Sequence, residues 1–133
     1  MKSSFSTSWN RSKQPRKQRK FVFNAPAHVR IKFMTSTLSS ELKKKHNKKN
    51  APVRKGDKVK ILRGQFKGKI GVVSAVNRVK SRVYVENIGI LKKDSTRSLY
   101  PIHPSNLMIT EIKLEDKKRK ASLERKQNGK KPH

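Results

Sequence analysis

The acidic residues and histidines are the side chains from which a catalytic or metal site would be built, because the chain has no cysteine. Its 133 residues include 8 acids and 4 histidines, and the histidines stand far apart at positions 28, 46, 103 and 133. Paired-carboxylate catalysis and metal binding need several ligands that converge on one point. Residues 51–110 offer only Asp57, Glu86 and Asp94 as acids. We therefore expect no catalytic role, no metal and no cofactor, and we interpret Asp57 as a turn residue before a strand.

The basic residues indicate a different chemistry. There are 36 Lys and Arg residues, which give a formal net charge of +28. Such a field opposes compaction unless a polyanion neutralises it, and nucleic acid is the abundant polyanion in cells. An apolar share of 32% leaves material for one small core, so much of the chain is expected to fold on its partner. No apolar run reaches the roughly 20 residues that span a bilayer, so membrane insertion is not expected.

The densest motif runs from Arg54 to Lys80. Within it, Gly64 and Gly68 bound a short basic loop, and glycine lets a backbone turn and approach another surface closely. The loop carries basic side chains for phosphate contacts, and Phe66 offers a face for base stacking. In the alternative interpretation, the glycines only permit a hairpin, Phe66 closes one end of a barrel and the lysines form a solvated rim. Gly71 is expected to be structural.

Three further basic clusters flank this motif. Arg11 to Lys20 could bind phosphates through arginine forks, or could serve as a nuclear-import patch. Lys43 to Lys49 and Lys117 to Lys120 are weaker candidates, since each could be a solvated helix face. The residues predicted to bind RNA are Arg11, Lys13, Arg16, Lys17, Arg19, Lys20, Arg30, Arg54, Lys55, Arg63, Gly64, Phe66, Lys67, Gly68, Lys69, Lys118 and Arg119.

The middle of the chain has the pattern of short strands. Polar and apolar residues alternate over 58–61 and 82–86, and the apolar run at 69–76 fits a strand with a bulge near Ser74. Shorter strands are expected at 98–102 and 107–110, with turns at 64–68, 77–81, 92–95 and 103–106. Five short strands with glycine-marked corners predict a mainly β fold, a small closed or nearly closed SH3-like barrel.

The flanking segments have helical signals. Ser39 can cap a helix that ends at His46, with Asn47 as its terminator. A second helix is expected to begin at Leu114-Glu115-Asp116, to run to Gln127 and to stop at Asn128-Gly129; its few apolar residues predict that it lies on a partner or in solvent. The expected organisation is a basic arm with short helices over 1–50, the barrel over 51–110, and a basic helix and tail over 111–133.

The motif at 54–80 resembles the KOW motif, which certain ribosomal proteins share with transcription elongation factors of the NusG and Spt-five type. Outside it, Ser12 to Lys20, Asn24-Ala25-Pro26, Tyr100 to Asn106 and Leu123 to Lys126 resemble the archaeal and eukaryotic KOW-domain protein of the large ribosomal subunit. This is the universal twenty-fourth large-subunit family, called the twenty-sixth in eukaryotes. The similarity extends from about Ser12 to Lys126, and residues 1–11 match no motif.

The resemblance implies a structural protein of the large subunit, with an SH3-like barrel and extensions embedded in rRNA. It further implies a role in subunit assembly and a place near the nascent-peptide exit. The expected partners are large-subunit rRNA, neighbouring ribosomal proteins and targeting factors at the exit tunnel, without homo-oligomer formation. The expected location is the cytoplasmic ribosome, with nuclear or nucleolar transit if the source is eukaryotic. Alternatives are an elongation or chromatin factor, an RNA-acting enzyme, and an organelle presequence at residues 1–11.

Overall fold

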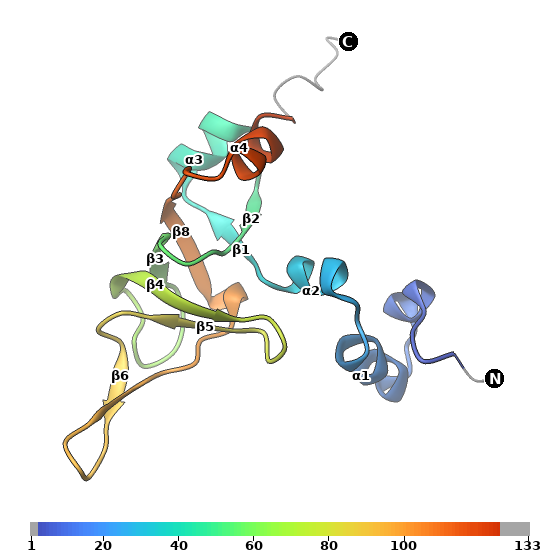
Figure 1. The fold of residues 1–133 in the computed structure, drawn as a ribbon, viewed down its shortest axis with the longest axis horizontal. Helices are drawn as coiled ribbons and strands as arrows, with labels where there is room; N and C mark the ends of the chain where they lie inside the picture. The colour runs from blue at the N-terminus through green and yellow to red at the C-terminus, as the bar shows by residue number, and fades with distance from the viewer. Residues whose placement is uncertain (1–2, 126–133) are drawn as a thin grey trace.

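The computed structural model describes residues 3–125, which form a β-rich body and a helical arm (Figure 1). The arm holds the 3-10 helix η1 (Thr7–Arg11) and the helices α1 (Pro15–Phe23) and α2 (Ala27–Phe33). Helices α3 (Ser40–His46) and α4 (Lys117–Glu124) belong to the body. Among the described residues no helix is long and apolar enough to cross a membrane.

Six strands form the main sheet of the body. They are β1 (Thr35–Leu38), β2 (Asn50–Pro52), β3 (Lys58–Ile61), β4 (Ile70–Asn77), β5 (Arg82–Val85) and β8 (Leu107–Glu111). Their order is β2-β1-β8-β3-β4-β5, and only β1 and β8 run parallel among the described pairs. The β-rich body is confirmed, but of the closed or nearly closed barrel that was expected, the closed form is not seen, because β2 and β5 end an open ladder and four helices accompany it.

Strand β4 joins two parts of the sheet because it is bent in the middle. Its first residues pair with β3, and the residues from Val73 to Asn77 pair with β5. The register shifts between Val73 and Ala75, which confirms the predicted bulge at Ser74. The Ser74 hydroxyl donates to the carbonyl of Tyr84, 3.1 Å away, and so ties the bulge to β5. A bulge of this kind increases local twist and redirects a strand.

The core lies under this sheet and follows the predicted alternation. Val59, Ile61, Leu107 and Ile109 are at most 1% exposed, as strands with one buried face require. Residues on the N-terminal side of position 50 also enter this core, since Met34 and Leu38 are buried there and β1 lies inside the sheet. The sheet therefore includes a segment that composition assigns to the arm.

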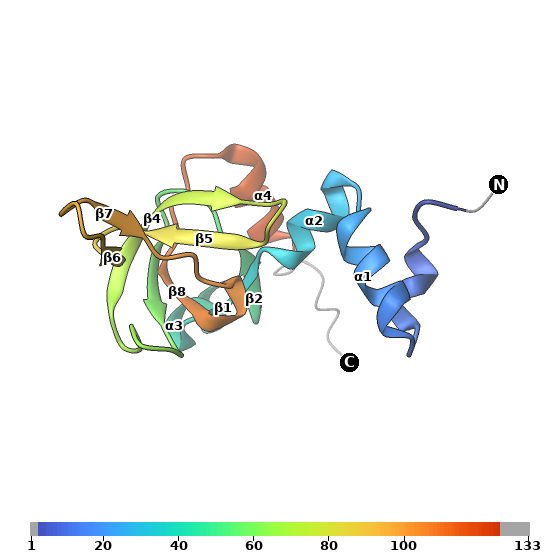
Figure 2. The same ribbon diagram turned by 90° about the horizontal axis from the view of Figure 1, so that it is seen from below.

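A separate hairpin, β6 (Gly89–Leu91) with β7 (Arg97–Leu99), projects from the sheet at the end opposite the arm (Figure 2). Its turn confirms the prediction for 92–95, with Lys92 N donating to Thr96 O at 2.9 Å. The strand predicted at 98–102 is displaced: β7 ends at Leu99, and Ile102 forms an isolated bridge to Val83.

Helix α3 forms as predicted, whereas α4 differs from expectation. Ser39 Oγ accepts a hydrogen bond from Leu42 N, and Asn47 ends α3 with a left-handed φ of 50°. Helix α4 begins only at Lys117, with Asp116 as its cap, and the stop predicted at 128–129 lies outside the described residues. Leu123 is 4% exposed within the core cluster, so the expectation that α4 lies on a partner or in solvent is wrong.

The arm has its own small apolar cluster. Phe21 is buried and stacks on Phe5 with ring centroids 5.4 Å apart, while Phe33 meets it edge-on at 5.8 Å. Trp9 packs against the same cluster. Residues 5 and 9, which match no motif, therefore help to hold the arm helices together.

Candidate nucleic-acid interface

The loop between β3 and β4 exposes Arg63, Lys67 and Lys69 around a turn set by two glycines. Gly64 has φ +93° and Gly68 has φ +85°, backbone conformations that L residues rarely adopt. Gly68 N donates to Ile61 O at 2.8 Å and closes the turn. A Cβ at either glycine would meet no described atom within 4 Å. The glycines are thus required by conformation, and the open space around them leaves the backbone accessible to another surface.

Phe66 anchors this loop to the body. It is half-buried against the core cluster, and its ring meets Tyr100 edge-on with centroids 5.2 Å apart. Lys69 Nζ lies 5.3 Å from the Phe66 centroid, within the range of a cation–π contact. The packing agrees with the interpretation that Phe66 covers one end of the sheet. Tyr100 is 36% exposed and is the more accessible of the two rings.

A cavity of about 220 Å³ separates this loop from the segment at 100–106. Its lining includes Arg63, Phe66, Arg82, Tyr100, His103 and Asn106. Desolvation, with a further contribution from Arg82, lowers the pKa of His103 from its ordinary value and so favours the neutral form of its ring. Ser105 N donates to His103 Nδ1 at 3.3 Å, which leaves the proton of the neutral ring on Nε2.

A larger cavity of about 780 Å³ lies where α2, β2 and β4 meet. Arg54, Lys55 and Arg78 line it together with apolar residues such as Ile31 and Val76. Arg54 also pairs with Asp116, and its guanidinium holds the pKa of that carboxyl below 3.8. The two predicted RNA-binding residues Arg54 and Lys55 are thus brought beside Arg78, which the sequence did not single out.

The arm presents most of its predicted cations to solvent. Arg11, Lys13, Arg16 and Arg19 are exposed, and no acid lies in the first turn of α1. Lys20 is exposed as well, and its Nζ lies 4.8 Å from the Trp9 ring centroid. In α2, Arg30 is half-buried and donates to Phe23 O at 2.9 Å, so it joins the two arm helices.

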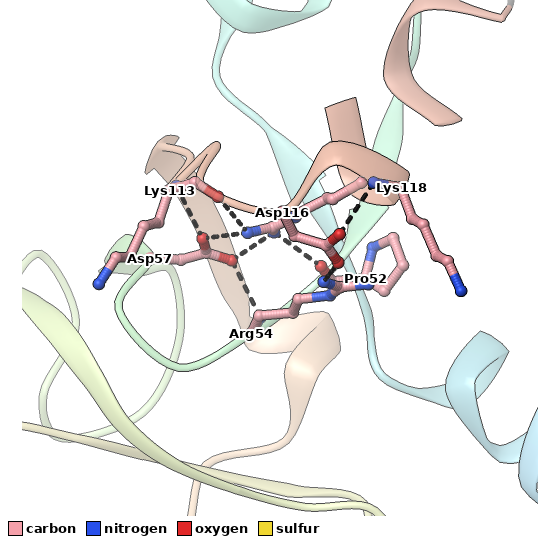
Figure 3. A network of polar contacts seen from close by, with 7 residues as sticks. Pro52, Arg54, Asp57, Lys113, Asp116 and Lys118 are labelled. Atoms are coloured by element: carbon pink, nitrogen blue, oxygen red, sulfur yellow. Dashed lines mark hydrogen bonds and ion pairs between the residues drawn. The ribbon is translucent and has the colours of Figure 1, made fainter. Parts of the chain in front are cut away.

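A buried ion pair connects α4 to the loop before β3. Asp57 is fully buried and accepts hydrogen bonds from Arg54 N, Lys113 N and the Arg119 guanidinium, with both Arg119 distances at 2.6 Å. Arg119 also donates to the carbonyls of Lys113 and Pro52. Figure 3 shows Asp57 between Lys113 and Arg54, with Asp116 beside them.

This network corrects one sequence-based interpretation and extends another. The basic run at 117–120 predicts that Arg119 binds RNA, but Arg119 is 6% exposed and its guanidinium is engaged inside the protein. Asp57 is more than the turn residue that its position suggests, because it is the acceptor that makes a buried arginine tolerable. Lys118, by contrast, is exposed on α4.

Ion pairing leaves the positive charge unevenly distributed. Residues 3–125 contain four ion pairs, and their acidic members are Asp57, Glu111, Glu115 and Asp116. All four acids lie in the loop before β3 or between the end of β8 and the start of α4. Neither the arm nor the loop at 62–69 has an ion pair within this part of the chain. No group of three potential metal ligands occurs among the described residues.

Comparison with known protein families gives the class of protein. A family model that describes the ribosomal proteins L26 of eukaryotes and their archaeal counterparts matches residues 12–126. The chain belongs to this ribosomal protein family. It is therefore a structural protein of the large ribosomal subunit that serves translation, and its family is not one of enzymes. The match includes both the basic segment from Ser12 to Lys20 and the loop at 62–69, so the resemblance seen in the sequence is confirmed.

In the structure, the predicted RNA-binding residues of this ribosomal protein lie in several separate regions. One group lies in η1, in α1 and in the segment that joins them, another lies in the loop at 62–69, and Arg54 and Lys55 line the larger cavity. The sequence missed Arg82, Tyr100 and His103, which come together beside the loop. In the sequence, the tyrosine directly before Pro101 was the feature that could have pointed to this second set of residues beside the loop.

Proposed function

We propose that the chain binds large-subunit rRNA through its arm and the loop at 62–69, supports subunit assembly, and lies near the nascent-peptide exit. The observation that carries the proposal is the uneven neutralisation of charge. Within residues 3–125, acids pair with cations in the loop before β3 and between the end of β8 and the start of α4, while η1, α1, α2 and the loop at 62–69 contain no ion pair. Such cations bind phosphates, and the released counterions favour the complex.

The arm helix α1 also supports an anionic partner. Its first turn contains basic residues and no acid, which is unfavourable beside the positive end of the helix dipole. RNA phosphates close to this end would remove the unfavourable charge. The apolar cluster around Phe21 gives the arm a shape that it can present to the RNA.

The hairpin β6–β7 supports contact with protein neighbours. Ile90 and Leu91 are 51% and 67% exposed, and Leu99 on the paired strand is 39% exposed. Exposed apolar residues grouped on one projecting element are typical of interaction sites. We assign this hairpin to neighbouring ribosomal proteins or to targeting factors at the exit. The ribosome would be cytoplasmic, with nucleolar transit during assembly in a eukaryote.

Two finer points of organisation belong to the same proposal. The bent β4, paired on both sides, supports an SH3-like KOW arrangement in which the ladder stays open between β2 and β5. The division into an arm over 1–50, a central β unit over 51–110 and a C-terminal part over 111–133 is kept as a proposal, with β1 of the first part added to the sheet.

Sedimentation of tagged chain from cell extracts tests the proposed function. In sucrose gradients at high salt we expect the chain to remain with the large subunit, because many phosphate contacts inside folded RNA are kinetically protected. A loosely held factor would dissociate as salt competes for phosphates. Recovery of the chain at the top of the gradient, with the large subunit intact below, would show that it is not a structural constituent.

A further inference from the structure

The cavity between the loop at 62–69 and the segment at 100–106 combines three kinds of group. It has an aromatic wall, in which Tyr100 is the more exposed ring and Phe66 supports it edge-on. It has two arginines, Arg63 and Arg82. It also has polar side chains, among them His103 and Asn106, and none of its lining residues is acidic.

The polar groups of this lining are available to a ligand. Within residues 3–125, the side chains of Arg63, Tyr100 and Asn106 form no hydrogen bond or ion pair. His103 Nδ1 accepts a hydrogen bond from Ser105 N, so the N–H donor of the neutral ring is Nε2. This donor points away from Ser105. Among the described residues, the Arg82 side chain donates only to the adjacent carbonyl of Ser81, which leaves most of its guanidinium donors unused there. Donors for phosphate and groups for a base edge therefore surround an aromatic ring.

We propose that this cavity accepts a single unpaired RNA nucleotide, with its base against Tyr100 and its phosphate held by Arg63 and Arg82. His103 Nε2 and the Asn106 amide would then meet the hydrogen-bonding edge of the base. The inference rests on the proposed function and deepens it. It names one specific RNA contact, which is distinct from the general electrostatic attraction between the basic arm and RNA.

The chemistry of RNA favours an unpaired nucleotide over a helix at this place. The bases of an RNA helix are stacked, and its deep major groove cannot be read by side chains. An extruded base exposes its faces and its hydrogen-bonding edge, which aromatic rings and polar groups recognise. A ring flanked by arginines and polar side chains in a small cavity matches that ligand.

Binding to five short hairpin RNAs tests the proposal. Four of them carry one unpaired nucleotide, A, G, C or U, at the same place in the stem, and the fifth has none. Affinities of the full chain are measured by fluorescence anisotropy at a salt concentration that weakens phosphate contacts. The variants are Tyr100→Leu, which removes the ring but keeps apolar bulk, and Tyr100→Phe, which keeps the ring. Urea unfolding checks that each variant is folded.

We expect the unsubstituted chain and Tyr100→Phe to bind at least one bulged hairpin about tenfold more tightly than the bulge-free one, within the range of base–aromatic stacking. Tyr100→Leu should lose this preference and bind all five RNAs alike. The inference is overturned if the unsubstituted chain shows no preference, or if Tyr100→Leu retains it. Neither result bears on sedimentation with the large subunit, so failure of the cavity and failure of the proposed function are distinguishable.

Discussion

Asp57 and Arg119 form the most consequential side-chain pair in the body. Their side chains are 0% and 7% exposed, and the two hydrogen bonds between them are both 2.6 Å long. Each charge is tolerated inside the protein because the other compensates it and because backbone groups form further hydrogen bonds with both side chains. The pair therefore fixes α4 against the loop before β3 and turns Arg119 inward, while Lys117, Lys118 and Lys120 of the same helix stay exposed.

Replacement of Asp57 by Asn tests this pair. We expect Asp57→Asn to lower the free energy of unfolding by about 3–5 kcal/mol, because Arg119 would remain buried without its counter-charge. Urea denaturation is the suitable measurement, since guanidinium salts screen ion pairs. The matched control is Asp116→Asn, which removes a carboxylate from the exposed pair with Arg54 and should change stability much less.

A double substitution sharpens the same test. The variant with Asp57→Leu and Arg119→Met removes both charges and leaves apolar side chains, so it should recover much of the lost stability. If Asp57→Asn unfolds at the same urea concentration as the unsubstituted chain, the pair does not hold α4 as the structure indicates.

At the scale of elements, α4 depends on a single apolar anchor. Leu123 is 4% exposed within the core cluster, whereas the neighbouring Lys120 is exposed on the same helix. We expect Leu123→Ala to destabilise the chain by about 2–5 kcal/mol, through lost burial and the cavity left behind. Lys120→Ala should have little effect. Urea unfolding measures both, and equal stability of the two variants would show that α4 is not part of the core.

Strands and caps with local signals could be predicted from the sequence. The alternation of Val59 and Ile61, the bulge at Ser74 and the Ser39 cap each depend on residues that are neighbours in the chain. Strand β1 could not be found in this way, because its short run Thr35–Leu38 is fixed in the sheet by parallel pairing with β8. Non-local pairing of this kind leaves no periodic pattern in four residues.

In the candidate interface, too, features set by neighbouring residues could be predicted, whereas features set by residues far apart in the chain could not. The glycine-bounded loop is visible in the sequence, and its positive φ angles agree with that interpretation. The run from Lys117 to Lys120 reads as uniformly basic, yet Arg119 faces inward because Asp57, 62 positions earlier, lies opposite it. Tyr100 and Arg82 likewise reach the loop only through folding. The basic composition predicts that the partner is a nucleic acid. It does not show which cations already form ion pairs or hydrogen bonds inside the protein.

For the whole molecule, the distribution of paired and unpaired cations matters more than the net charge of +28. Arg16 and Arg19 on α1 have no acidic partner among the described residues, whereas Lys58 and Lys113 pair with Glu111 and Glu115. Two double variants therefore remove the same charge from different surroundings. One carries Arg16→Gln and Arg19→Gln, and the other carries Lys58→Gln and Lys113→Gln.

The affinity of each double variant for purified large-subunit rRNA, measured by filter binding over a range of salt concentrations, separates the two kinds of cation. Each lost phosphate contact should reduce the slope of log affinity against log salt by about 0.7–0.9, so the arm variant should lose about 1.5. The variant at Lys58 and Lys113 should keep nearly the full slope, because its cations are neutralised within the protein. Equal losses in the two variants would mean that net charge alone drives binding and that the arm has no special role.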